Sequence, residues 1–174
     1  MADSIIIDPV QKNDDAGVFR LIDTQRLRLQ TYFPVTCGRC RDVRGTRAYL
    51  KEMVSMAKAR EFFCFVLRDY EGSEPIGLLF LREFDHDLGK CEIAYLVHAN
   101  YEGKGYATLA VCWGVDHAFT TLGMQKVYAR VLPDNMASWK VLENCGFQRD
   151  GVLRQDHRLP TGEVVDVYLY SVLR

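Results

Sequence analysis

The spacing of hydrophobic residues changes along the chain, and each spacing predicts a kind of secondary structure. Apolar residues three or four positions apart indicate helices, whereas short β-branched or alternating apolar runs indicate strands. Helical spacing predicts helices over residues 14–32, 46–60 and 105–122 and in the segment that Asn135 opens. Gly123 follows the third helix, at the position where a glycine commonly ends one.

Seven short apolar runs have the composition of β-strands. They cover residues 4–7, 62–68, 76–84, 90–97, 126–131, 147–154 and 164–173. Gly and Pro residues predict turns at 70–75 and 160–162, and residues 35–44 are predicted to form a loop. The resulting order, β-α-α-β-β-β-α-β-α-β-β, contains no repeat or linker and predicts a single domain over residues 1–174.

Composition and charge narrow the class of protein. Of the 174 residues, 48% are hydrophobic and 26% are charged, which is usual for a globular protein. The formal net charge of −1 gives no electrostatic reason to expect binding to nucleic acid or to a membrane surface. The apolar runs are shorter than the ~20 residues of a membrane span, and the first one is too short for a secretory signal. We therefore expect a cytoplasmic protein.

Six cysteines are scattered along the chain, and only Cys37 and Cys40 lie close together in the sequence. A zinc site needs about four ligands, and no second Cys/His pair has metal-binding spacing. We therefore predict no metal, and we interpret the pair as two thiols in a loop rather than as a redox dithiol. Cysteines inside apolar segments are expected to be buried as small hydrophobic residues.

Residues 102–108, Glu-Gly-Lys-Gly-Tyr-Ala-Thr, lie at the start of the third predicted helix. Gly103 and Gly105 lack Cβ atoms, so the backbone can turn tightly and approach a ligand. The first N–H groups of a helix have no partner within it, and the helix dipole favours an anion there. These features predict a pyrophosphate site, to which Lys104 adds charge, although a plain glycine-rich turn is the alternative. The spacing does not fit a dinucleotide fingerprint or a Walker-type loop.

A second motif lies downstream, where Asn135 and Ser138 stand at the start of a predicted helix and Gly146-Phe147 follows its end. The two motifs, in this order, resemble the pyrophosphate loop and the second CoA-contacting helix of the GNAT acetyltransferase superfamily. With the strand at 90–97, they are most similar to its branch of ribosomal-protein alanine and serine N-terminal acetyltransferases. The resemblance implies an α/β (α+β) GNAT fold, in which helices flank a mixed, mostly antiparallel central sheet with splayed central strands.

The resemblance also implies acetyl-CoA as co-substrate and no metal. The strand at 90–97 would bind the pantetheine arm through backbone groups, as an added strand does. Glu102 departs from the family pattern, which has Gln or Arg, and a carboxylate beside a diphosphate is unfavourable unless it points away or caps the helix. The implied cofactor-binding residues are Tyr95, Leu96, Val97, Glu102, Gly103, Lys104, Gly105, Tyr106, Ala107, Thr108, Asn135 and Lys140.

Acetyl transfer to an amine needs a base for the amine, donors for the oxyanion and a proton for the departing thiolate. Ser138 matches the serine that resembling enzymes place near the sulfur, so it is the candidate general acid; capping of its helix is the alternative. Glu92 and His157 are the candidate general bases. The alternatives are an ion pair for Glu92, an exposed loop position for His157, and a water chain in place of both.

We predict an N-acetyltransferase in which a primary amine attacks acetyl-CoA directly in a ternary complex. A protein N-terminal α-amine is the first expected acceptor, and a polyamine or an aminoglycoside is the alternative. Asp85, Asp87 and Asp156 would favour a polycation if they formed an acidic groove. A non-catalytic acyl-CoA-binding regulatory module is the competing class. We expect a monomer or a homodimer.

Overall fold

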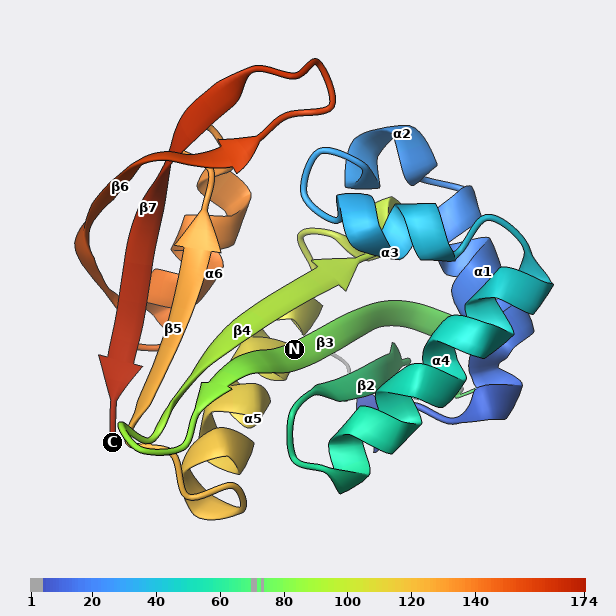
Figure 1. Ribbon diagram of the computed structural model, residues 1–174, viewed down its shortest axis with the longest axis horizontal. Coiled ribbons are helices and arrows are strands. Elements are labelled where there is room, and N and C mark those ends of the chain that lie inside the picture. Colours follow the sequence, from blue (N-terminus) through green and yellow to red (C-terminus); the bar gives the residue numbers. More distant parts are fainter. Residues whose placement is uncertain (1–4, 70–71, 73) are drawn as a thin grey trace. The chain divides into compact units, whose positions relative to one another are not determined.

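The computed structural model describes residues 5–69, 72 and 74–174 (Figure 1). The chain divides into two compact units. The first unit holds residues 1–80 and 95–106, and the second holds residues 81–94 and 107–174. The chain crosses between them within two strands and at the start of one helix. That the whole chain works as one acetyltransferase domain stays a prediction.

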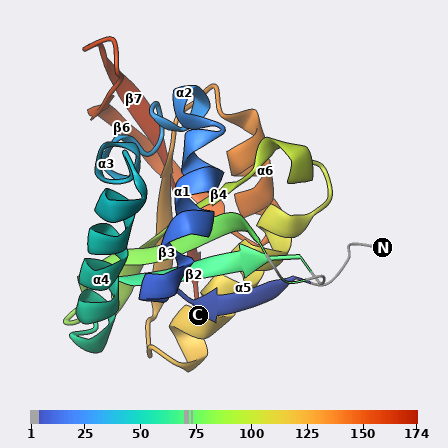
Figure 2. The same ribbon diagram turned by 90° about the vertical axis from the view of Figure 1, so that its right-hand side faces the viewer.

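Four strands form the sheet of the first unit, in the order β1-β2-β3-β4. Strand β1 is antiparallel to β2, with Ile6 opposite Arg68 (Figure 2). In β2, residues 64–67 are all buried, and because successive side chains point to opposite faces, both faces of this strand are covered. The bounds are β1 Ile6–Pro9, β2 Phe63–Arg68, β3 Pro75–Asp85 and β4 Lys90–Val97. Residue 4 of the first predicted strand and residues 70, 71 and 73 of the turn predicted at 70–75 lie outside the described residues.

Short helices in the first unit replace two predicted elements. The prediction of one helix over 14–32 is wrong, because the backbone of Gln25 leaves the helical conformation with φ −136° and ψ 24°. Thr24 and Gln25 instead cap the first helix, donating side-chain hydrogen bonds to the carbonyls of Arg20 and Leu21 at 2.8 and 2.9 Å. The helices are η1 Lys12–Asp14, α1 Asp15–Asp23, α2 Arg26–Leu29, α3 Pro34–Arg39 and α4 Val43–Lys58.

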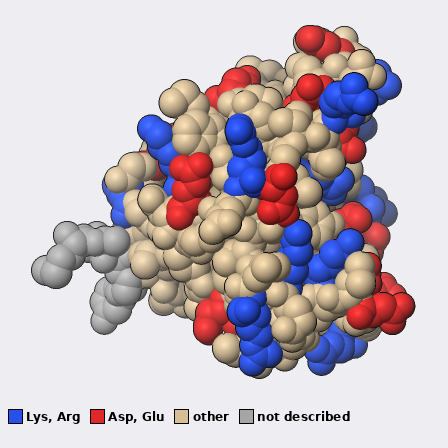
Figure 3. All heavy atoms as spheres, turned by 90° about the vertical axis from the view of Figure 1, so that its left-hand side faces the viewer, with Lys and Arg blue, Asp and Glu red and all other residues tan. Residues whose placement is uncertain are grey.

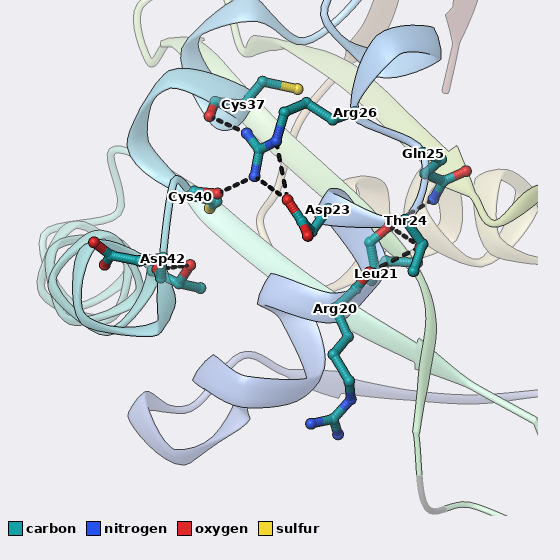
Figure 4. A network of polar contacts seen from close by, with 10 residues as sticks. Arg20, Leu21, Asp23, Thr24, Gln25, Arg26, Cys37, Cys40 and Asp42 are labelled. Carbon is teal, nitrogen blue, oxygen red and sulfur yellow. Dashed lines mark hydrogen bonds and ion pairs between the residues drawn. The ribbon is translucent and has the colours of Figure 1, made fainter.

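Helix α3 occupies the segment predicted to be a loop, so that prediction is also wrong. Pro34 stands at its first position, where proline is well tolerated. At its other end, the guanidinium of Arg26 donates to the carbonyls of Cys37 and Cys40 at 2.7 and 2.6 Å, and it also binds Asp23 (Figure 4). A cation that satisfies the last carbonyls of a helix stabilises its end. A partner eleven residues away in the sequence therefore fixes this helix.

Both thiols of this segment are buried, since Cys37 is 6% and Cys40 0% exposed. Burial raises the pKa of each thiol, which makes them poor nucleophiles. Among the described residues, no group of three or more His, Cys, Asp or Glu side chains could hold a metal ion.

The second unit contains the sheet order β3-β4-β5-β7-β6, so the seven strands follow one another as β1-β2-β3-β4-β5-β7-β6. Strand β5 is parallel to β4 and antiparallel to β7, which pairs with β6 as a long ribbon (Figure 1). The fold prediction is confirmed: helices flank a mixed, mostly antiparallel sheet. The new bounds are β5 Lys126–Val131, β6 Gln148–Arg158 and β7 Val164–Leu173.

Two helices, α5 Tyr106–Thr120 and α6 Met136–Asn144, accompany these strands. A disulfide links Cys112 of α5 to Cys145, which follows α6, with 5.3 Å between their Cα atoms. The sequence did not reveal this bond. No helix of the described chain is long and apolar enough to cross a membrane.

Candidate functional site

The predicted phosphate loop begins after the short helix η2, Ala99–Tyr101, in the first unit. Gly103 and Gly105 have φ angles of +73° and +84°, which residues other than glycine rarely adopt. A Cβ added to Gly103 would meet no atom within 4 Å, so backbone conformation rather than space requires this glycine. The loop then enters α5. A helix supplies no carbonyl partner to its first N–H groups, so this turn can offer several N–H donors to an anion.

Two aromatic rings support the loop. The Nζ of Lys104 lies 5.0 Å from the ring centroid of Tyr101, within cation–π range. The ring of Tyr106 is 6.1 Å from that of Tyr101, and Tyr106 is only 4% exposed. Lys104 itself is exposed. The predicted loop residues therefore differ in their surroundings. The glycines permit the turn, the buried Tyr106 anchors it, and Lys104 keeps its charge at the surface.

Glu102, the departure from the family pattern, forms an ion pair with Arg28 of α2. Nη2 of the same guanidinium donates to the carbonyl oxygen of Val97 at 2.7 Å and also binds the side chain of Gln25. The carboxylate is thus neutralised by a cation 74 residues away in the sequence. Sequence reasoning missed Arg28, because nothing in the residues around it indicates a partner so far along the chain.

The backbone of β4 has two different edges. His98 N–H donates to Ile76 of β3 at 2.8 Å, and the Leu96 carbonyl lies beside Gly77. Because backbone groups of successive strand residues alternate in direction, Tyr95 and Val97 direct theirs to the opposite edge. Of the three residues predicted to pair with a pantetheine arm, two therefore present main-chain groups away from β3, and the backbone of Leu96 faces β3.

In the second unit, the parallel ladder between β4 and β5 comprises three pairs and ends at Glu92 and Tyr128. Both strands continue beyond this point, to Val97 and Val131. The central strands therefore part after Glu92, as the resemblance implied.

Asn135 and Ser138 come together at the start of α6. Asn135 is the N-cap, and its Oδ1 accepts a hydrogen bond from the Ser138 N–H at 3.2 Å. Ser138 is half-buried, whereas Lys140 is exposed. Between them, the buried indole Nε1 of Trp139 has no hydrogen-bond partner in the described structure. The cap accounts for the role of Asn135 in the fold, and it places the Ser138 side chain in the first helical turn.

Glu92 lies on β4, is 2% exposed and is bound by two arginines. Arg82 Nε donates to it at 2.7 Å, and Arg130 donates from Nε at 2.9 Å and from Nη2 at 3.1 Å. Burial alone would raise the pKa of this carboxyl, but the hydrogen bonds and charges of Arg130 and Arg82 outweigh burial and hold its pKa below the ordinary value. Sequence reasoning missed both arginines, although Arg130 could have been noticed as a charge inside an apolar strand.

His157 lies on β6, opposite Val165 of β7. The register of this strand pair shifts between Leu153 and His157, and Gln155 within the irregularity has a φ of +52°. The neighbouring Asp156 is 3.8 Å from Arg130. The two candidate bases therefore stand on different strands, with β5 and β7 between them in the sheet order.

The comparisons with known proteins agree on one family, the acetyltransferases. The family model described as an acetyltransferase (GNAT) domain matches residues 4–148. The uncharacterized N-acetyltransferase p20 of Bacillus licheniformis is 38% identical over 104 residues, which are 60% of this chain and 58% of p20. Spermidine N(1)-acetyltransferase of Vibrio cholerae is 29% identical over 110 residues, 63% of this chain and 62% of that protein. The chain thus matches less than two thirds of the length of these relatives.

Solved structures share the fold over more of the chain. Ribosomal-protein-S5-alanine acetyltransferase from Vibrio fischeri superimposes with a TM-score of 0.90 at 22% identity, over 97% of this chain and 92% of that one. Mycobacterium smegmatis RimJ, solved in complex with CoA-disulfide, superimposes with a TM-score of 0.89 at 25% identity, over 99% and 83%.

Proposed function

The chain belongs to the acetyltransferase (GNAT) domain family, and from this premise we propose that it transfers the acetyl group of acetyl-CoA to a primary amine. The observation that carries the proposal is the turn at Gly103 and Gly105, which opens α5 with its neighbouring carboxylate, Glu102, paired to Arg28. Main-chain N–H groups at a helix start, with a lysine at the rim, suit a diphosphate. Residues 103–108, Tyr95 and Val97 would hold the carrier, and Asn135 and Lys140 would add contacts from α6.

The chemistry needs no covalent enzyme intermediate. A deprotonated amine attacks the thioester carbonyl, a tetrahedral oxyanion forms, and its collapse expels the CoA thiolate. We assign Ser138 as the proton donor to that thiolate, since its hydroxyl stands in the first turn of α6 beside the Asn135 cap. Its role would be to lower the barrier to departure of the sulfur.

We assign the base role to His157 rather than to Glu92. A general base is most effective when its pKa lies near the working pH, and two arginines move the pKa of Glu92 further below that range. Glu92 then serves to fix Arg130, which also lies 3.8 Å from Asp156, the neighbour of His157. A water chain that takes the amine proton is the alternative.

We propose a primary amine as the acceptor. A protein N-terminal α-amine is our first choice, and a polyamine is the second, which the spermidine-acetylating relatives favour. Of the acidic residues that could form a polycation groove, Asp85 lies 3.7 Å from Lys90 and Asp156 lies 3.8 Å from Arg130. Carboxylates that already have cationic neighbours attract a polyamine less strongly, and this supports the α-amine. A cytoplasmic location and a monomeric or dimeric state remain parts of the proposal.

The test is a thiol-release assay with acetyl-CoA and separate panels of N-terminal peptides, polyamines and aminoglycosides. Release with alanine- or serine-initiated peptides alone supports the first acceptor, and release with spermidine alone supports the second. CoA binding in a calorimeter without release by any amine would contradict catalysis and indicate a regulatory module.

A further inference from the structure

Arg28 binds both ends of the segment that joins β4 to the phosphate loop. Its Nη2 donates to the Val97 carbonyl at 2.7 Å, where β4 ends, and Nη1 is paired with Glu102, where the loop begins. The η2 turn lies between these two contacts. One planar guanidinium with several fixed donors is suited to such a bridge, which a lysine could not copy.

A second contact from the same helical junction reaches this segment. The Thr24 hydroxyl lies 3.3 Å from His98 Nε2, and His98 Nδ1 accepts from the Asn100 N–H at 3.2 Å. Because Nδ1 accepts, a neutral His98 ring carries its proton on Nε2 and donates to Thr24. Arg28 of α2 and Thr24, which precedes that helix, thus hold Val97, His98 and Glu102.

The positive charge of Arg28 matters as much as the geometry of its contacts. The side chain of Glu102 is 56% exposed and directly precedes Gly103. An unpaired carboxylate there would repel a diphosphate held by the following N–H groups. Arg28, itself 39% exposed, cancels that charge.

We propose that Arg28 is a positioning residue for the acyl-carrier loop, neutralising Glu102 and fixing the path from Val97 to Gly103. The inference rests on the proposed function, because it assumes that this loop binds the diphosphate of CoA. Arg28 then affects binding of the carrier and leaves the chemical step unchanged. The guanidinium acts through the loop, because its hydrogen bonds go to Glu102, Gln25 and Val97 of the protein itself.

The experiment compares wild type, Arg28→Ala and the double variant Arg28→Ala/Glu102→Gln by calorimetric titration with CoA and by steady-state kinetics. Arg28→Ala should raise the Kd for CoA and the KM for acetyl-CoA about tenfold with little change in kcat. Removal of the uncompensated carboxylate in the double variant should return the Kd to within about threefold of wild type. Arg20→Ala is the matched control, because Arg20 forms an ion pair with Glu74 on the same unit without touching the loop.

S-acetylpantetheine, which lacks the diphosphate, separates a loop effect from general damage. Arg28→Ala should lower kcat/KM for acetyl-CoA about tenfold and that for S-acetylpantetheine clearly less, because this substrate meets the backbone at Val97 but not the diphosphate loop. An equal loss with both substrates, or a double variant no better than Arg28→Ala, would overturn the inference. A wild-type protein that binds no CoA would overturn the proposed function as well. CoA binding by wild type that Arg28→Ala leaves unchanged would overturn this inference alone.

Discussion

Arg130 of β5 donates two hydrogen bonds to the carboxylate of Glu92 on β4, at 2.9 and 3.1 Å. The pair lies where the parallel ladder between these strands ends, because Glu92 opposite Tyr128 is its last pair. The carboxylate is 2% exposed, and Arg82 binds it from β3. One buried carboxylate therefore joins three strands at the last pair of the β4–β5 ladder.

Glu92→Gln should reduce the stability of the protein more than it reduces the rate of catalysis. The amide leaves two guanidinium groups without their anion, and loss of one partner of a buried pair costs roughly 3–5 kcal/mol. Because Arg82 and Arg130 keep about a third of their side chains exposed, water takes up part of the loss, and we expect about 2 kcal/mol in the free energy of unfolding. Chemical denaturation measures it. Glu74→Gln, at an exposed pair, is the control, and an unchanged midpoint for Glu92→Gln would contradict the prediction.

Low pH should remove the contribution of Glu92 to the free energy of unfolding. The folded-state pKa of Glu92 lies below its ordinary value, so its stabilisation is complete above the unfolded pKa of about 4.3 and is lost as the pH falls through the folded value. The difference in unfolding free energy between wild type and Glu92→Gln should therefore be constant from pH 7 to 5 and shrink below about pH 4. A difference that does not vary between pH 7 and 3 would refute this account.

Ser138→Ala should lower kcat about 10²-fold, because the thiolate then leaves without its proton donor. The KM for acetyl-CoA should change little, since the Asn135 cap uses the Ser138 backbone rather than its hydroxyl. Thr120→Ala removes a hydroxyl that bonds only within α5 and serves as the control. A normal turnover rate in Ser138→Ala would eliminate this serine as the acid.

His157→Gln should lower kcat about 10²-fold if His157 accepts the amine proton. Glu92→Gln, measured on its folded fraction, should lose far less activity. Stopped assays at matched fractions of folded protein make the comparison direct. The reverse ranking would transfer the base role to Glu92.

The Cys112–Cys145 disulfide should stabilise the second unit. It closes a chain segment with a sequence separation of 33, for which the loop-entropy relation gives about 3–4 kcal/mol. Dithiothreitol should lower the denaturation midpoint of wild type and leave that of Cys112→Ser/Cys145→Ser unchanged. Mass spectrometry after alkylation should find two additional labelled cysteines upon reduction. Equal midpoints with and without reductant would show that the bond contributes nothing.

Much of the fold was predictable from local patterns. Strands β4, β5 and β7 begin and end where their apolar runs do, and the start of α6 after Asn135 was predicted. Residues 24–39 were not predictable, because their helices depend on side-chain caps such as Arg26, which binds carbonyls 11 and 14 residues away. Local periodicity contains no information about such partners.

The candidate site shows the same limit. The glycines of the loop and the Asn135–Ser138 pair were found from their spacing. Arg28 was not, since its partners Val97 and Glu102 stand 69 and 74 residues further along the chain. The disulfide was missed because cysteine positions do not determine pairing.

On the face that Figure 3 shows, basic and acidic side chains are interspersed. This agrees with the nearly balanced totals of 22 Lys and Arg against 23 Asp and Glu. In the second unit, Lys126 and Asp150 form an ion pair at 2.8 Å.

Because a disulfide links Cys112 of α5 to Cys145 after α6, the properties of a preparation depend on whether it was exposed to a reductant. Batches purified with and without a thiol reagent would differ by two hydrogen atoms and still melt at different temperatures. A mixed batch would give two melting transitions and imitate a protein whose halves unfold independently. The redox state of the sample must therefore be set before its cooperativity is judged.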